Sequence, residues 1–153
     1  MTALRTRTRR LILPPEPRRR IQTWAEGLYP GEACGLLLGR EDQRDPNALH
    51  VVRTFLARNL FGEESTERYE VDPVDLLAAE RAAAANNLQV IGVWHSHADQ
   101  QAQPSDLDLE HAWEGWSYLI VAVTRAGVAQ MRSWRLDTSR RGRRRFQEET
   151  VEA

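Results

Sequence analysis

The spacing of apolar residues along the chain predicts two helices. Four apolar side chains follow the i, i+3, i+4, i+7 order of one helix face: Ile21, Trp24, Ala25 and Leu28. This order predicts an amphipathic helix over about 16–28, which the Pro-Gly pair at 30–31 ends. A second, alanine-rich helix is expected to begin after Asp72, an N-cap residue. Pro73 suits its first helical position, and it is expected to reach about residue 86.

Short apolar runs rich in β-branched residues predict the strands. These runs lie at 34–38, 50–56, 89–95, 117–123 and 128–136, with a further short strand expected at 69–71. The last two long runs are joined by a turn that contains Gly127, which predicts a hairpin. A third helix is expected over 105–114, and its apolar stripe and exit are Leu109, Ala112, Trp113 and Trp116. The order of elements predicts an α/β (mixed α+β) fold, a mixed sheet with helices packed on it.

The two ends of the chain are polar and strongly charged. Residues 1–17 are basic and contain prolines, so a loose basic arm is expected there. Residues 138–153 carry clustered arginines followed by acids, which indicates a charged tail in solvent or a short terminal helix. The folded domain is therefore expected over 18–137.

Composition is typical of one globular domain with a substantial core. The chain has 153 residues, of which 41% are hydrophobic and 28% are charged. The net charge is −1, which excludes a global field that would attract nucleic acid or an acidic membrane. No apolar run is long enough to span a bilayer. The single cysteine, Cys34, excludes an internal disulfide and fits a reducing compartment, so we expect a cytoplasmic protein.

Metal-binding residue types gather after the strand predicted at 89–95. His95 and His97 are followed by Ser105 and Asp108, in the pattern H-x-H, seven residues, S, two residues, D. Alternate side chains of an extended strand point to one side, so the two imidazoles are expected to face together. Two imidazoles and one carboxylate can hold Zn²⁺ and leave its fourth position open to water. Ser105 and Asp108 share one helix face, but the same pair also matches a capping box, a purely structural device.

An acid upstream makes the pattern specific. Glu32 stands just before the apolar strand at 34–38, in the run Pro-Gly-Glu-Ala-Cys-Gly-Leu-Leu-Leu-Gly. Together with H-S-H-x7-S-x2-D, this run resembles the JAMM (MPN+) metallopeptidase domain over about 21–136. The resemblance implies an MPN/JAMM fold, which is a central mixed β-sheet flanked by helices. It also implies a site in which His95, His97 and Asp108 bind zinc, Glu32 is the general acid/base and Ser105 is the site serine.

The resemblance also implies a substrate. JAMM peptidases cut amide bonds that follow the C-terminal tail of ubiquitin-like proteins, and the run around Glu32 is similar to the branch that acts on sulfur-carrier proteins. The predicted function is zinc-dependent hydrolysis of the amide bond after a C-terminal diglycine tail, with cysteine as one leaving group. Two alternatives stay open: a RadC-like protein of DNA repair, whose usual H-N-H-P motif fits less well, and a non-catalytic MPN scaffold. The oligomeric state is not predicted.

Two large apolar residues, Leu60 and Phe61, lie in the otherwise polar stretch 58–68. They either pack back on the core or belong to one wall of the groove for the diglycine tail, and the sequence leaves both interpretations open. The remaining candidates are expected to have structural roles. Trp94 and Cys34 are expected in the core. The other titratable residues near these elements are expected in solvent or in packing roles: His50, Asp99, Asp106 and His111.

Overall fold

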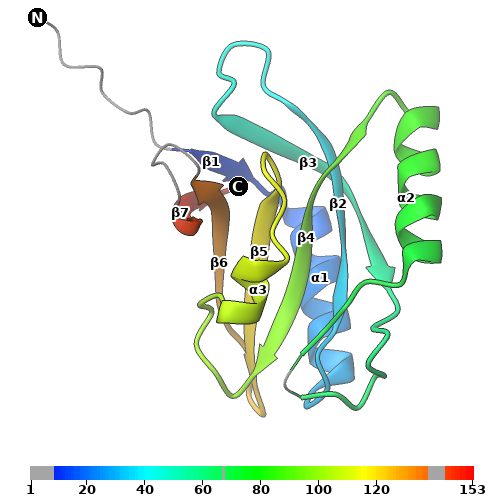
Figure 1. Ribbon diagram of the computed structural model, residues 1–153, viewed down its shortest axis with the longest axis vertical. Coiled ribbons are helices and arrows are strands. Elements are labelled where there is room, and N and C mark those ends of the chain that lie inside the picture. The colour runs from blue at the N-terminus through cyan, green and yellow to red at the C-terminus, as the bar shows by residue number, and fades with distance from the viewer. Residues whose placement is uncertain (1–8, 67, 138–143) are drawn as a thin grey trace, which may run out of the picture.

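In the computed structural model, residues 9–66, 68–137 and 144–153 are described, and they form a sheet closed into a barrel with three helices around it (Figure 1). The strands are β1 (Arg10–Ile12), β2 (Cys34–Glu41), β3 (Ala48–Ala57), β4 (Gln89–Ala98), β5 (Ser117–Thr124), β6 (Gly127–Asp137) and β7 (Arg145–Glu152). The helices are α1 (Pro15–Leu28), α2 (Pro73–Ala85) and α3 (Asp106–Glu110). The strand order is β1-β3-β2-β4-β5-β6-β7.

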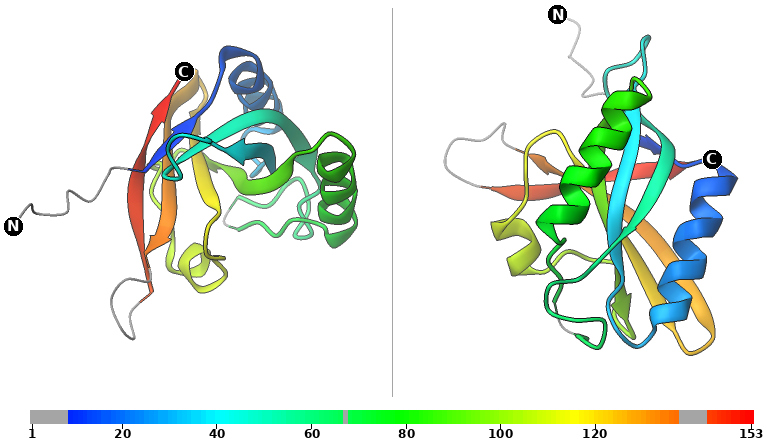
Figure 2. Two further views of the ribbon diagram at one scale, coloured as in Figure 1. Left: turned by 90° about the horizontal axis from the view of Figure 1, so that it is seen from above. Right: turned by 90° about the vertical axis from the view of Figure 1, so that its right-hand side faces the viewer.

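The sheet is mixed, as the sequence predicted. Strand β4 pairs with β5 in parallel, and β1 pairs in parallel with both β3 and β7. The remaining neighbours are antiparallel, including the β5–β6 hairpin that turns at Gly127. Helices α1 and α2 lie on opposite sides of β2 (Figure 2). The predicted mixed α+β architecture is therefore confirmed.

Strand alternation divides the core between the two helices. On β2, Leu37 packs into the cluster that includes Ile21 and Ala25 of α1. Its neighbours Leu36 and Leu38 pack into a second cluster, which contains Ala79 and Ala83 of α2. Strand β2 therefore carries apolar side chains on both faces, and this explains why its sequence is an unbroken apolar run.

Several predicted elements need new bounds. Strand β4 does not stop at residue 95 but continues to Ala98, because β5 pairs with it as far as that residue. Helix α3 ends at Glu110 rather than 114, and Gly115, with a φ of +82°, helps to turn the chain back toward β5. The expected strand at 69–71 is reduced to one bridge, between Asn59 and Val71.

The prediction for the two ends is wrong where the structure forms β1, the start of α1 and β7. Residues 10–17 are not a loose arm, because β1 lies between β3 and β7, Leu11 is fully buried and α1 begins at Pro15. The expected charged tail is strand β7 over its described part. Residues 1–8 and 138–143 lie outside the described residues.

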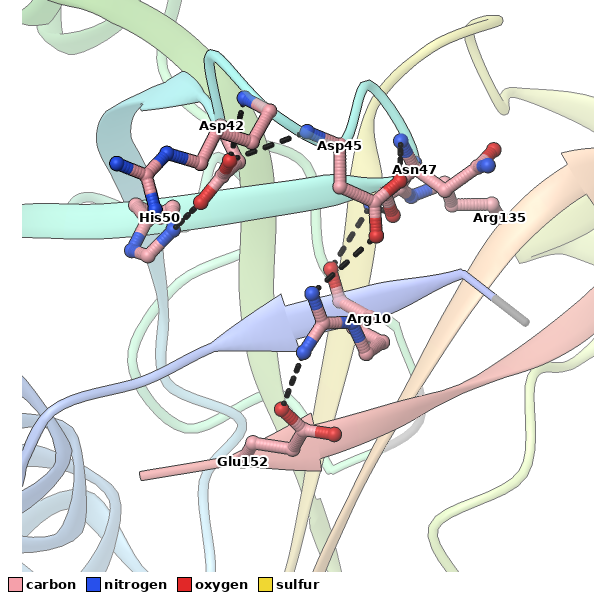
Figure 3. Close-up of polar contacts among 8 residues, drawn as sticks. Arg10, Asp42, Asp45, Asn47, His50, Arg135 and Glu152 are labelled. Atoms are coloured by element: carbon pink, nitrogen blue, oxygen red, sulfur yellow. Dashed lines mark hydrogen bonds and ion pairs between the residues drawn. The ribbon is translucent and has the colours of Figure 1, made fainter. Parts of the chain in front are cut away.

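Charged side chains connect β1 to its neighbours at the point where the barrel closes (Figure 3). Arg10 of β1 forms ion pairs with Glu152 of β7 at 3.0 Å and with Asp45, just before β3, at 3.2 Å. Arg135 of β6 donates to the backbone carbonyl oxygens of Arg10 and Asn47. These contacts connect β1 to β6, to β7 and to the residues just before β3, where the barrel closes.

Beneath them, a buried ion pair joins β6 to β7. Arg135 Nε lies 2.5 Å from Glu149 Oε2, and their side chains are 7% and 0% exposed. The other oxygen of Glu149 accepts a hydrogen bond from the Ser133 hydroxyl at 2.6 Å. A charge pair buried in this way stabilises the fold only while both partners are present.

We expect Glu149→Ala to lower the free energy of unfolding by about 3–5 kcal/mol, because the guanidinium of Arg135 stays buried without its partner. Urea unfolding measures the loss. The matched control is Glu148→Ala, which breaks the exposed pair with Arg132 and should cost less than about 1 kcal/mol. Equal effects of the two substitutions would contradict a special role for the buried pair.

Within the described residues, no helix has the length and apolar character needed to cross a membrane.

Candidate metal centre

Three side chains converge with the spacing of metal ligands. The Nε2 atoms of His95 and His97 are 3.0 Å apart. Asp108 Oδ2 lies 3.6 Å from the first and 4.0 Å from the second. Ligands about 2.1 Å from a tetrahedral zinc ion are about 3.4 Å from one another, and the three distances here lie on either side of that value. Among the described residues this is the group of histidine and carboxylate side chains that could hold a metal.

The sheet places the two histidines. His95 is paired with Cys34 on β2 and with Ile120 on β5, so its backbone is held from both sides. Alternation along β4 then turns His95 and His97 to one face, and Trp94, which precedes them, to the other. Trp94 is fully buried and stacks on Trp24 of α1, which confirms the prediction that it belongs to the core.

A capping box places the carboxylate. The hydroxyl oxygen of Ser105 accepts a hydrogen bond from the backbone amide of Asp108 at 3.1 Å, and the amide of Ser105 donates to Asp108 Oδ2 at 2.8 Å. The structural interpretation of this pair is therefore confirmed. The box also fixes the oxygen that faces the histidines, so one local motif both starts α3 and orients a ligand.

Two of the three candidate ligands, His97 and Asp108, carry the charge that a metal requires. Burial lowers the pKa of His97, and the nearby charge of His95 lowers it further, which favours the neutral imidazole. His97 Nδ1 lies 2.9 Å from the carbonyl oxygen of Gln101, which can only accept, so Nδ1 carries the proton and Nε2 the lone pair. Burial raises the pKa of Asp108, but hydrogen bonds from His95 and Ser105 outweigh it and lower that pKa to about 2.

Glu32 lies beside these ligands in a dry environment. Its residue is 3% exposed, and among the described residues its Oε2 atom has no hydrogen-bond partner. Burial raises the pKa of Glu32 to about 7, although the charge of His95 opposes the change. A carboxyl group with a pKa near 7 can both accept and release a proton at neutral pH.

Backbone contacts hold Glu32 in place. Its amide donates to the Ser65 carbonyl at 2.7 Å, and its carbonyl accepts a long hydrogen bond of 3.5 Å from the side chain of Asn59. The next residue, Ala33, donates its amide to the hydroxyl of Ser96 on β4 at 2.8 Å. The start of β2 is thereby fastened to the part of β4 that carries the histidines.

One cleft contains all five residues predicted for the site. Its volume is about 760 Å³. The predicted residues that line it are Glu32, His95, His97, Ser105 and Asp108. Phe61 also lines the cleft and is 45% exposed, whereas Leu60 does not line it and is 52% exposed. Neither side chain packs back into the core, and the groove interpretation fits Phe61 alone.

Other aromatic residues of the cleft were assigned differently from the sequence. Trp113 was expected in the apolar stripe and exit of the third helix, but it is 68% exposed, stacks on Trp116 and lines the cleft. Tyr69 was expected in a short strand, but its ring stacks on His95. The sequence carries no signal for this contact, because the two residues meet only through the fold. His111, expected on the surface or packed, also lines the cleft.

The remaining sequence assignments are structural. Cys34 is buried, and burial together with the charges of Asp75 and Glu32 raises the pKa of its thiol to about 12, which fits a core residue. Asp99, at a φ of +56°, accepts a hydrogen bond from the Tyr29 hydroxyl. His50 Nε2 lies 2.8 Å from Asp42 Oδ2 (Figure 3), and neither residue lines the cleft.

Comparison with known proteins identifies the family. The family model described as prokaryotic homologs of the JAB domain matches residues 14–137. The chain belongs to this family. The predicted JAMM resemblance and the fold class are therefore confirmed.

Relatives within the JAB family include named enzymes. Desampylase of Haloferax volcanii is 35% identical over 97 residues, which cover 63% of this chain and 66% of that protein. CysO-cysteine peptidase of Mycobacterium tuberculosis is 29% identical over 109 residues, which cover 71% of this chain and 70% of that protein. The chain spans about two thirds of the length of the desampylases it matches. A solution structure from Desulfitobacterium hafniense is 27% identical, with a TM-score of 0.76, and covers 92% of this chain and 90% of that chain.

The dry carboxyl of Glu32 predicts a pH-dependent stability of the metal-free protein. A folded-state pKa of about 7, above the ordinary value of 4.5, means that ionising Glu32 destabilises the fold as pH rises from about 5 to 7. In chelator, Glu32→Gln should therefore gain stability relative to the parent across this range, by up to about 3 kcal/mol. Urea unfolding at pH 5 and pH 8 measures the change. Glu80→Gln, an exposed acid of the same cleft, is the control and should show no such trend.

Proposed function

We propose that this protein hydrolyses, with Zn²⁺ as cofactor, the amide bond that follows the C-terminal diglycine tail of a ubiquitin-like or sulfur-carrier protein. The observation that carries the proposal is one cleft that holds both a converging His-His-Asp triad and the buried carboxyl group of Glu32, whose Oε2 atom has no hydrogen-bond partner among the described residues. The relatives named desampylase and CysO-cysteine peptidase support the choice of substrate class.

The donor set suits zinc. Two neutral imidazole nitrogens and one carboxylate oxygen form a set of three protein ligands, which is typical of catalytic zinc sites with one open position. His95, His97 and Asp108 would hold the ion. When bound, zinc supplies Lewis-acid chemistry: it lowers the pKa of water toward 7 and polarises a carbonyl group.

Glu32 is proposed to move the protons. With a pKa of about 7, its carboxylate can take a proton from the attacking water at neutral pH. The resulting carboxylic acid can return that proton to the leaving amine as the amide bond breaks. Its exclusion from bulk water keeps the proton at the reacting groups.

Ser105 is proposed to stabilise the negative charge that develops on the carbonyl oxygen. Its role as helix cap uses a lone pair of the hydroxyl oxygen as acceptor. The hydroxyl proton is not used in that contact, so it is free to be donated toward the cleft. The capping role and the catalytic role therefore do not compete for the same part of the group.

The cleft also suggests how a tail is selected. Phe61 lines it, and the guanidinium of Arg68 lies 4.6 Å from the centre of the Phe61 ring. We infer that a wall built from this ring and guanidinium favours an extended tail without side chains near the metal ligands. The cytoplasmic location expected from the sequence stays a prediction.

The central experiment combines metal content with turnover. We expect about one zinc per chain in the purified protein, lost in the double variant His95→Ala, His97→Ala. Glu32→Gln should keep the zinc but lower kcat by about 10²–10⁴-fold on a carrier that ends in Gly-Gly-Cys. Elemental analysis and mass spectrometry of the released cysteine provide the two measurements. Glu80→Gln is the control and should retain normal turnover.

Two results would count against this proposal. If the wild-type protein takes up no zinc when the metal is added, the proposed metallopeptidase function is excluded. Loss of zinc from Glu32→Gln would make Glu32 a ligand instead of the acid/base.

Tail specificity is a separate prediction. Replacing the two glycines of the carrier tail with alanines should abolish detectable cleavage, because methyl groups would meet the walls of the cleft. Phe61→Ser should raise KM several-fold while zinc content and melting temperature stay unchanged. Leu60→Ser is the matched control, since Leu60 is also an exposed apolar residue but does not line the cleft. Equal cleavage of Gly-Gly and Ala-Ala tails would remove the case for this substrate class.

A further inference from the structure

Tyr69 packs against one of the two candidate ligand imidazoles. Its ring is stacked on that of His95, with 4.1 Å between the ring centres and 21° between the planes. A histidine ring that is covered on one face in this way cannot turn about its Cβ–Cγ bond without pushing the tyrosine aside. The contact therefore restrains the direction in which Nε2 points.

The two histidines are held by different means. His97 donates its Nδ1 proton to the Gln101 carbonyl, which is the usual way in which a protein fixes a ligating imidazole. His95 is 1% exposed, and among the described residues its Nδ1 atom has no hydrogen-bond partner. His95 thus lacks the kind of hydrogen bond that orients His97. The stacked ring of Tyr69 restrains it instead.

The backbone on both sides of Tyr69 is held by hydrogen bonds to residues 59 and 60. The side chain of Asn59, which is 8% exposed, donates to the carbonyl oxygen of Arg68 at 3.1 Å and accepts from the amide of Glu70 at 3.0 Å. These two hydrogen bonds fix the backbone on both sides of Tyr69. The amide of Leu60 also donates to the Glu70 carbonyl at 2.9 Å.

We propose that Tyr69 is a positioning residue that holds the imidazole of His95 in its metal-binding orientation by stacking, and that Asn59 anchors it there. The inference rests on the proposed function, because it assumes that His95 binds a metal. It assigns a specific task to the segment 68–71. This segment shapes the wall of the cleft and also sets the affinity of the metal centre. The aromatic ring is the part that matters, since among the described residues the Tyr69–His95 contact is ring stacking and not a hydrogen bond of the hydroxyl.

The test is metal affinity measured without substrate. Zinc binding is followed by competition with a chromogenic chelator, and the ligand geometry is followed by the visible spectrum of the Co²⁺-substituted protein. Tyr69→Phe keeps the ring and should bind zinc within about twofold of the parent. Tyr69→Leu removes the ring and should weaken zinc binding about tenfold or more, in the range found when a contact that orients a ligand is lost. It should also alter the Co²⁺ spectrum.

Phe61→Leu is the matched control, because it removes another aromatic ring that lines the same cleft without touching His95. It should leave zinc affinity unchanged. Tyr69→Met provides a second non-aromatic side chain, and the circular dichroism of the chelated proteins shows whether each variant folds. Folded Leu or Met variants with weakened zinc binding would support the proposal.

Parent-like zinc affinity in Tyr69→Leu would overturn the inference and leave the proposed function intact. Equal loss of affinity in Tyr69→Phe would also overturn it, because the hydroxyl would then be the important group. Failure of both non-aromatic variants to fold would show that Tyr69 is needed for the fold as a whole and would likewise overturn it. Absence of zinc binding in the parent would overturn the proposed function and this inference together.

Discussion

The double pairing of strand β4 is the constraint on which the rest of the site depends. Its backbone is hydrogen-bonded to β2 on one side and to β5 on the other around His95. The ladder allows no change of register, since a shift by one residue would turn both histidines into the core and Trp94 into the cleft. Side chains on such a strand are held more accurately than side chains on a loop. The two imidazoles are therefore presented side by side before any ligand arrives.

This arrangement buries polar groups that a core would otherwise exclude. Glu32 and His95 are almost inaccessible to water, and each has a side-chain atom without a partner among the described residues. Such groups destabilise a fold, because they lose their hydrogen bonds to water and gain none. The apolar clusters on both faces of the sheet offset this cost, and the buried pair of Arg135 and Glu149 secures the closure of the barrel. Local destabilisation at one cleft of an otherwise well-packed domain is expected of a functional site.

The cleft is completed by two short segments that use hydrogen bonds in place of extensive burial. The capping box at the start of α3 fixes Asp108 and leaves the Ser105 proton available. On the opposite side, Asn59 joins the backbone of Glu32 to the segment that carries Tyr69. Both devices are small, and both act on groups that touch the candidate metal centre. A change in either segment is therefore a change in the site, even where the barrel is unaffected.

The sequence by itself determined the features whose physical signal is local. The apolar period of α1, the Asp72-Pro73 start of α2, the alternation that groups His95 with His97, and the capping box of Ser105 with Asp108 can each be recognised within a few residues. The role of Glu32 needed the family resemblance, because an acid before a strand has no distinctive pattern. Only the tertiary structure decided the rest. Strand β7 is too polar to be recognised, and it forms because it closes the barrel and buries Glu149 against Arg135. The stacking of Tyr69 on His95 likewise arises from a contact between distant parts of the chain, and no period or propensity within a short window carries that information.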